Sequence, residues 1–115
     1  MQFNSELKDD ILILRLSGDL IGEDKGFSLL ELVNDTTADY VVKCVVDISE
    51  LRYINSSGIG VLITILTKFR NKDGEVYLVN PSESVQKLLI ITKLNAIFNV
   101  SESIEAAIEA LKSIK

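Results

Sequence analysis

The stretch between residues 40 and 69 decides the fold, and it opens with YVVKCVV at residues 40–46. This run is almost wholly apolar and rich in β-branched residues, which is typical of a strand buried on both faces of a parallel sheet. Farther along, apolar residues recur at positions 59, 62, 63, 66 and 69. That spacing predicts an amphipathic helix with one apolar face.

The segment between this strand and this helix carries the polar motif of the chain. Residues 47–55 are interpreted as a connection, and they are followed by Ser56, Ser57 and Gly58. A serine oxygen can accept a hydrogen bond from an unpaired amide of a first helical turn, so either serine is expected to cap the helix. The Asn-Lys-Asp-Gly sequence at residues 71–74 is expected to end it.

Working outward, the remaining sequence alternates between strand-like and helix-like patterns. The expected strands cover two runs within residues 2–20 joined by a turn at 8–10, then residues 75–79 and 98–100. The expected helices begin near residues 27, 80 and 101, and the first is expected to break at residues 36–39. The order β-β-α-β-α-β-α-β-α predicts an α/β fold with a mixed, mostly parallel sheet. We expect one domain over residues 1–115.

Composition narrows the classes of function. The chain has 115 residues, a formal net charge of -5 and no histidine. Without an imidazole, the usual general base and the common nucleophile pairs are missing, and the single Cys44 cannot form an internal disulfide or a thiolate metal cluster. We therefore expect no catalytic residues, no cofactor and no metal site, and we expect that the protein is not an enzyme.

The net negative charge and the length of the apolar runs indicate which binding partners and which cellular compartment to expect. An acidic chain is repelled by nucleic acid phosphates and anionic membrane surfaces, so neither is an expected partner. Residues 1–20 do not read as a secretory signal, and the longest strongly apolar run, residues 59–66, is far shorter than the roughly 20 residues of a spanning helix. We expect a cytoplasmic protein with no membrane insertion.

Several motifs have both a structural and a functional interpretation. Ser56 and Ser57 could accept a phosphate beside the positive end of the helix, or they could only cap it. The Gly58-Ile59-Gly60 turn matches neither a Walker loop nor a dinucleotide fingerprint, so a turn device is favoured.

Other candidates lie near the expected strand ends. The acidic residues there, Asp19, Glu23, Asp24 and Asp47, could approach a cation, although solvated loop carboxylates are the simpler interpretation. Ile21 and Ile54 could be exposed anchors for a protein partner or could close the end of the core.

Three segments together resemble one protein family. They are LRLSGDL at residues 14–20, VVDIS at 45–49 and YINSSGIGVL at 53–62. In this order and spacing they resemble the STAS domain family, and within it the bacterial anti-sigma factor antagonists. The resemblance covers essentially the whole chain. It implies a compact α/β fold with a central sheet and helices packed mainly on one side.

The resemblance also implies a mechanism. Such proteins bind an anti-sigma factor that is itself a serine kinase of the GHKL type, and thereby free the sigma factor. The kinase phosphorylates a serine at the start of the second helix, which weakens the complex, and a PP2C-type phosphatase removes the phosphate. The family motif Asp-Ser-[Ser/Thr]-Gly maps the acceptor to Ser56, with Ser57 as second choice. Here Asn55 replaces the usual Asp, and Ile21 stands where an acidic residue is common.

A partner surface follows from the resemblance together with the turn positions. Its expected residues are Asp19, Ile21, Glu23, Asp24, Asn55, Ser57, Gly58, Ile59 and Gly60. The alternative is a STAS subunit with no phosphorylation cycle that serves another complex, such as a lipid-transport ATPase or a stressosome-like scaffold. A small hydrolase or nucleotide-binding enzyme is the weakest alternative, because the sequence has no histidine and no phosphate loop.

Overall fold

One mixed sheet forms the centre of the protein, whose structure is a computed structural model that describes residues 2–21, 24–38 and 41–113, with side chains omitted at residues 24–27. The sheet has five strands in the spatial order β1-β2-β3-β4-β5, and these are β1 (Gln2–Lys8), β2 (Ile11–Leu20), β3 (Lys43–Ile54), β4 (Glu75–Val79) and β5 (Asn99–Ser101). β1 is antiparallel to β2, and the other neighbours are parallel. The helices are α1 (Asp24–Ala38), α2 (Ser56–Arg70), α3 (Glu83–Ile91) and α4 (Ile104–Lys112), with a 3₁₀ turn, η1, at Leu94–Ala96.

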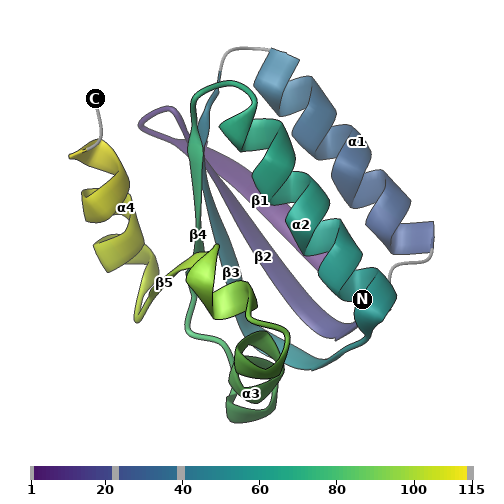
Figure 1. Ribbon diagram of the computed structural model, residues 1–115. Coiled ribbons are helices and arrows are strands. Elements are labelled where there is room, and N and C mark those ends of the chain that lie inside the picture. Colours follow the sequence, from purple (N-terminus) through teal and green to yellow (C-terminus); the bar gives the residue numbers. More distant parts are fainter. Residues whose placement is uncertain (1, 22–23, 39–40, 114–115) are drawn as a thin grey trace.

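The helices divide unevenly between the two faces of the sheet (Figure 1). Side chains alternate along β2, so that Leu12 and Leu14 join a large core with residues of α1, α2 and α3. Ile11 and Ile13 point to the other face, where they form a smaller cluster with residues of α4. The sequence prediction of an α/β fold with helices mainly on one side of a mixed sheet is confirmed.

β3 is longer than the sequence predicts, because residues 47–54 are strand and not a connection. Its second half pairs with β2 alone, since the pairing with β4 ends at Asp47. The register shifts twice in this half: Arg15 pairs with Asp47 and Ser17 with Glu50, then Gly18 with Leu51 and Asp19 with Tyr53. Each shift places one extra residue in β3 and breaks the two-residue alternation from which strands are usually predicted.

Helix α1 also extends beyond its expected end. Thr36 and Thr37 lie inside the helix, and their hydroxyls donate hydrogen bonds of 2.8 and 3.1 Å to the carbonyl oxygens of Leu32 and Val33. Threonine hydroxyls that bond to the preceding turn satisfy their own polar groups, so the two residues do not break the helix.

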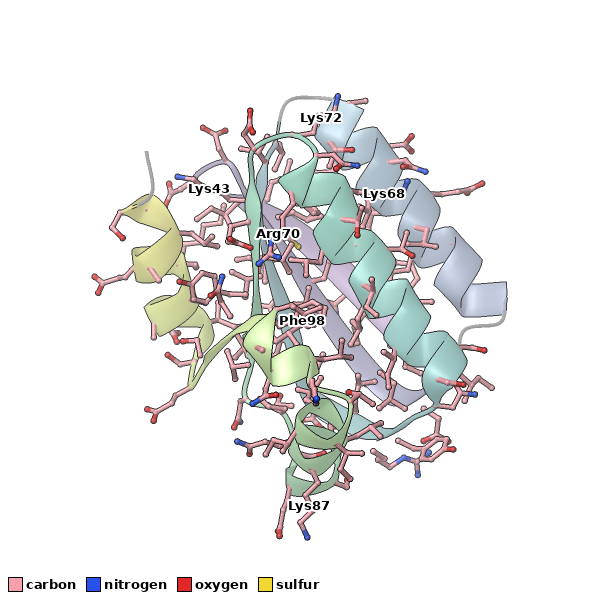
Figure 2. All side chains as sticks on the ribbon, in the orientation of Figure 1. Lys43, Lys68, Arg70, Lys72, Lys87 and Phe98 are labelled. Atoms are coloured by element: carbon pink, nitrogen blue, oxygen red, sulfur yellow. The ribbon has the colours of Figure 1, made fainter. Side chains whose placement is uncertain are left out.

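The C-terminal end of α2 is basic and is tied to the neighbouring elements. Lys68 and Arg70 lie in the last turn, where positive charge is favourable against the helix dipole. Arg70 donates to Glu75 at 3.1 Å and to the carbonyl oxygen of Ile97 at 2.7 Å, and its side chain lies beside β4 in Figure 2. These contacts fix α2 to the start of β4 and to the segment after η1.

Candidate functional site

The carboxyl ends of β2 and β3 meet at the start of α2. Leu20 and Ile54 are register partners at these ends, and the backbone amide of Asn55 donates to the carbonyl oxygen of Leu20 at 3.3 Å. In parallel sheets the functional surface tends to lie where strands end and helices begin. The parallel direction of the two strands therefore presents the end of β2, with Ile21 after it, and the first turn of α2 on one surface.

Asn55, and neither serine, is the N-cap of α2. It has extended backbone angles, and its Oδ1 accepts a hydrogen bond of 2.8 Å from the amide of Gly58. The expectation that Ser56 or Ser57 caps the helix is wrong, because the helix begins one residue earlier than that interpretation requires. Asparagine is among the preferred capping residues, so the cap does not depend on an aspartate at this position.

Ser56 and Ser57 occupy the first two helical positions, and both side chains are exposed. Within the part of the chain that the structure describes, neither hydroxyl has a recorded hydrogen bond. The amides of a first helical turn have no intrahelical partner and carry the positive end of the helix dipole. Both hydroxyls are therefore accessible beside a site that favours negative charge.

The two glycines that follow have different surroundings. Gly58 is buried, and a Cβ atom there would overlap the carbonyl oxygen of Leu20 and lie 2.9 Å from Cγ1 of Ile54. Gly60 is exposed, and a Cβ atom there would meet nothing within 4 Å. Gly58 is thus required for close contact between α2 and the end of β2, whereas Gly60 leaves a bare patch of helix on the surface.

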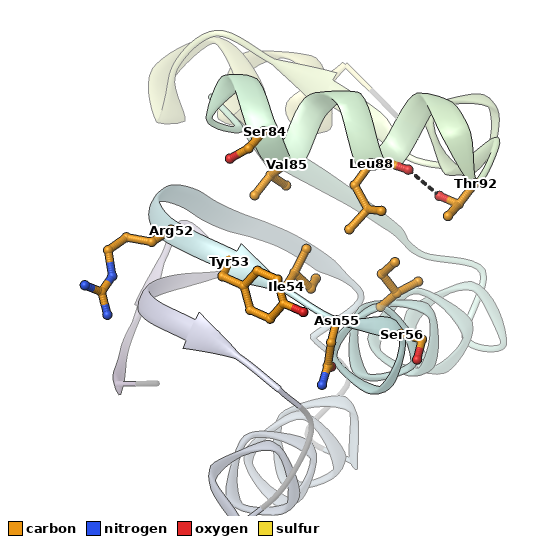
Figure 3. Close-up of a pocket in the computed structure, with 10 residues that line it drawn as sticks. Arg52, Tyr53, Ile54, Asn55, Ser56, Ser84, Val85, Leu88 and Thr92 are labelled. Atoms are coloured by element: carbon orange, nitrogen blue, oxygen red, sulfur yellow. Dashed lines mark hydrogen bonds between the residues drawn. The ribbon is translucent and has the colours of Figure 1, made fainter.

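A cavity of about 570 Å³ opens directly beside Ser56. The end of β3 and the start of α2 form one wall, and α3 forms the opposite wall (Figure 3). Its lining residues are Arg52, Tyr53, Ile54, Asn55, Ser56, Ile59, Ser84, Val85, Leu88 and Thr92. The deeper side chains are aliphatic and the hydroxyl and guanidinium groups lie toward solvent, so the cavity can accept an apolar group from another molecule.

Ile54 and Ile21 differ in their exposure to solvent. Ile54 is 4% exposed and belongs to the core, where its side chain forms part of the cavity wall. Ile21, which follows β2, is 40% exposed. Only Ile21 has the exposure that an anchor for a partner needs.

The structure describes only some of the acidic residues of the expected partner surface. The side chain of Asp19 is 46% exposed and lies 3.5 Å from the guanidinium of Arg52, a surface pair of small energetic value. Asp24 begins α1, but its side chain lies outside the described residues, as does Glu23 altogether. Ile59 is buried, although it also lines the cavity.

Sequence reasoning missed the far wall of the cavity and two residues of the near wall. Tyr53 is 55% exposed at the end of β3, and Arg52 precedes it. Ser84, Leu88 and Thr92 come from α3. Tyr53 stands close to the serine motif in the sequence, but neither its exposure nor the position of α3 opposite Ser56 follows from the local sequence.

Two further features of the described residues bear on other functions. Residues 2–21, 24–38 and 41–113 contain no group of three or more histidine, cysteine or acidic residues placed to hold a metal ion. Asp47, one of the acidic candidates, accepts a hydrogen bond of 3.0 Å from the amide of Ser49. No helix in the described part of the chain has the length and apolar character to span a membrane.

Comparison with known proteins places the chain in a family. The model of the STAS domain matches residues 2–107, so the chain belongs to the STAS domain family. A Thermotoga maritima protein with the assigned name "putative anti-sigma factor antagonist" is 26% identical over 110 residues, which cover 96% of this chain and 97% of that protein. A similarly named protein of Bordetella bronchiseptica, BtrV, is 32% identical over 71 residues, which cover 62% of this chain and 61% of that protein.

Solved structures agree with this fold. The crystal structure of the Thermotoga maritima protein matches with a TM-score of 0.87 at 26% identity, covering 96% of this chain and 94% of that one. The anti-sigma factor antagonist SpoIIAA in its unphosphorylated form matches with a TM-score of 0.79 at 18% identity, covering 98% of this chain and all of that one. At that identity, the likeness to SpoIIAA shows the shared fold.

Proposed function

We propose that this protein is an anti-sigma factor antagonist whose unmodified form binds an anti-sigma factor with serine kinase activity, and that phosphorylation of Ser56 disrupts that binding. The observation that carries the proposal is the position of Ser56. Its side chain is exposed at the first position of α2, and Asn55 supplies the cap, so the hydroxyl is not needed by the helix. The names of the relatives support the antagonist function, and SpoIIAA has been solved in a phosphorylated form as well.

The surface around Ser56 suits a partner that covers it. Exposed Ile21 and Tyr53 lie at the ends of β2 and β3, and aliphatic side chains form part of the wall of the 570 Å³ cavity beside Ser56. Burial of such groups stabilises a complex by roughly 25 cal/mol per Å² of apolar surface before the cost of association. Exposed Gly60 adds a stretch of helix that a partner can approach closely.

A phosphate on Ser56 would act on the complex and leave the fold intact. It adds about -1.5 to -2 charge beside the free amides of the first turn of α2, where an anion is favourable. The same group would place a strongly hydrated charge inside the covered surface. A loss of about 3 kcal/mol in binding would weaken the complex on the order of a hundredfold.

Treatment with the kinase and then with the phosphatase tests whether Ser56 is the phosphorylated residue. Incubation of the protein with the anti-sigma kinase of the same cell and ATP, followed by peptide mass mapping, should locate one phosphate on Ser56. A PP2C-type phosphatase should then remove it. Ser57→Ala is the matched control and should be labelled like the unmodified chain, whereas labelling of Ser56→Ala to the same extent would refute the assignment.

Calorimetric titration with the same kinase measures the switch itself. Ser56→Asp should weaken binding by at least tenfold, and Ser56→Ala should bind about as tightly as the unmodified chain. If Ser56→Asp binds with unchanged affinity, the protein is a docking subunit without a phosphorylation switch.

A further inference from the structure

The outer edge of β1 is long, regular and open. β1 spans seven residues that pair with β2 in one unbroken register, from Gln2 with Ser17 to Lys8 with Ile11. It is the first strand of the sheet, so no strand of the described residues lies along its other edge. An edge of this length without a bulge or a proline is a template for another strand.

The turn at residues 9 and 10 determines which backbone groups face this edge. Asp9 and Asp10 have φ values of 54° and 62°, as in the two-residue turns of tight hairpins. Such a turn is closed by a hydrogen-bonded pair, here Lys8 and Ile11, and the bonds then alternate along the strand. The amides and carbonyls of Phe3, Ser5 and Leu7 therefore point away from β2, to the open edge.

We propose that the β1 edge pairs with the β1 edge of a second copy of this chain, antiparallel, about a two-fold axis through Ser5. This is the register that uses the whole strand, because Ser5 is its midpoint. It places Ser5 opposite Ser5 of the second copy and Phe3 opposite Leu7, and each of these pairs closes two backbone hydrogen bonds. The two sheets then form one continuous sheet.

The side chains of β1 fit this register. Leu7 is 62% exposed, and in the dimer it is covered by Phe3, which is itself only partly buried against the core. On the other face of the strand, Glu6 lies opposite Asn4 and Lys8 opposite Gln2. Charged groups thus meet neutral amides, and the register avoids the like-charge pairs that would destabilise cross-strand pairing. This complementarity of the strand with itself identifies a second copy as the occupant.

Cross-linking tests the register. Ser5→Cys places two sulfur-bearing residues opposite each other with Cα atoms about 5.5 Å apart, within the usual disulfide range. Leu7→Cys is the matched control, because the two Leu7 positions lie four residues apart along the strand, roughly 13 Å. The native Cys44 is fully buried and does not compete. Mild oxidation should give a covalent dimer of Ser5→Cys and not of Leu7→Cys; equal cross-linking of the two variants would overturn the proposed register.

Sedimentation of the full chain tests the edge itself. The unmodified protein should approach twice the mass of one chain as its concentration rises toward about 1 mM. Ser5→Pro removes only an outward amide, which an edge strand tolerates, and should weaken the dimer at least about tenfold. Val100→Lys on β5 removes an exposed apolar side chain from the opposite edge and should leave the dimer unchanged. A protein that stays monomeric throughout, or a dimer lost in Val100→Lys and kept in Ser5→Pro, would overturn the proposal.

Discussion

Two glycines in the first turns of α2 should respond in opposite ways to the same substitution. Alanine is favoured over glycine inside a helix by about 1 kcal/mol, chiefly because glycine loses more backbone entropy on folding. At Gly60 a new methyl group meets nothing within 4 Å. Gly60→Ala should therefore raise the free energy of unfolding by about 1 kcal/mol.

Gly58→Ala gains the same helical preference, but its methyl group would clash with neighbouring backbone atoms. The new Cβ would overlap the carbonyl oxygen of Leu20, which cannot rotate aside as a flexible side chain could. Moving α2 away would stretch the 3.3 Å hydrogen bond from Asn55 to Leu20, worth about 1 kcal/mol, and would add an overpacking cost of about 1–3 kcal/mol. After the helical gain is subtracted, Gly58→Ala should lower the free energy of unfolding by about 2 kcal/mol.

Urea denaturation followed by circular dichroism measures both variants on one scale. The midpoints should move in opposite directions, and the free energies of unfolding of the two variants should differ by about 3 kcal/mol. Because both substitutions add one methyl group to the same helix, helical propensity cancels from the difference. A Gly58→Ala variant as stable as the unmodified chain would show that the contact between α2 and β2 is not close, and would refute the reasoning.

Three further predictions concern the cap at Asn55, the ion pair between Asp9 and Lys112, and the buried thiol of Cys44. Asn55→Ala loses the cap on Gly58 and should cost about 1 kcal/mol in urea denaturation, whereas Asn55→Asp keeps the cap and adds a favourable charge; equal stability of the two would contradict this. The hydrogen bond and the charge of Lys112 lower the pKa of Asp9, so Lys112→Ala should raise that pKa toward its ordinary value in an NMR titration. The stability from this pair is present at neutral pH and is lost as the pH falls through the lowered pKa of Asp9, so a variant with the same acid dependence as the unmodified chain would argue against it. Burial raises the pKa of the Cys44 thiol, so a thiol reagent should label it only as fast as the protein unfolds, and rapid labelling of the native chain would contradict that.

Regular hydrophobic periodicity made the order of strands and helices predictable. The apolar run that contains Cys44 and the helical spacing from Ile59 to Phe69 each gave the correct kind of element. The end of β3 was not predictable in this way, because two extra residues place Ile48, Leu51 and Ile54 at intervals of three. Such a pattern departs from the alternation that marks a strand, and only the pairing with β2 makes these residues extended.

In the candidate site, too, local sequence patterns pointed to some residues, and tertiary packing alone adds the others. Ser56, Asn55 and Ile21 are close in sequence to turn signals that marked them as candidates, and the family resemblance then selected Ser56 as the acceptor. The cavity beside Ser56 depends on how α3 lies against the end of β3, and Leu88 therefore enters the site through tertiary packing. A wall that comes from a distant helix leaves no signature in the motif itself.

In the proposed switch, the cap of α2 and the modified hydroxyl belong to different residues, Asn55 and Ser56. If Ser56 were the cap, a phosphate on it would replace the capping hydroxyl, so modification of this residue would also change the hydrogen bonding of the first helical turn. Because Asn55 accepts the hydrogen bond from the amide of Gly58 at 2.8 Å, the Ser56 hydroxyl can be modified while the helix start stays intact. A neutral residue at position 55 also avoids a carboxylate next to the phosphate, so the free amides of the first turn face one anion and not two. Asparagine at position 55 is thus compatible with the proposed switch, whose effect would be confined to the surface that the proposed partner covers.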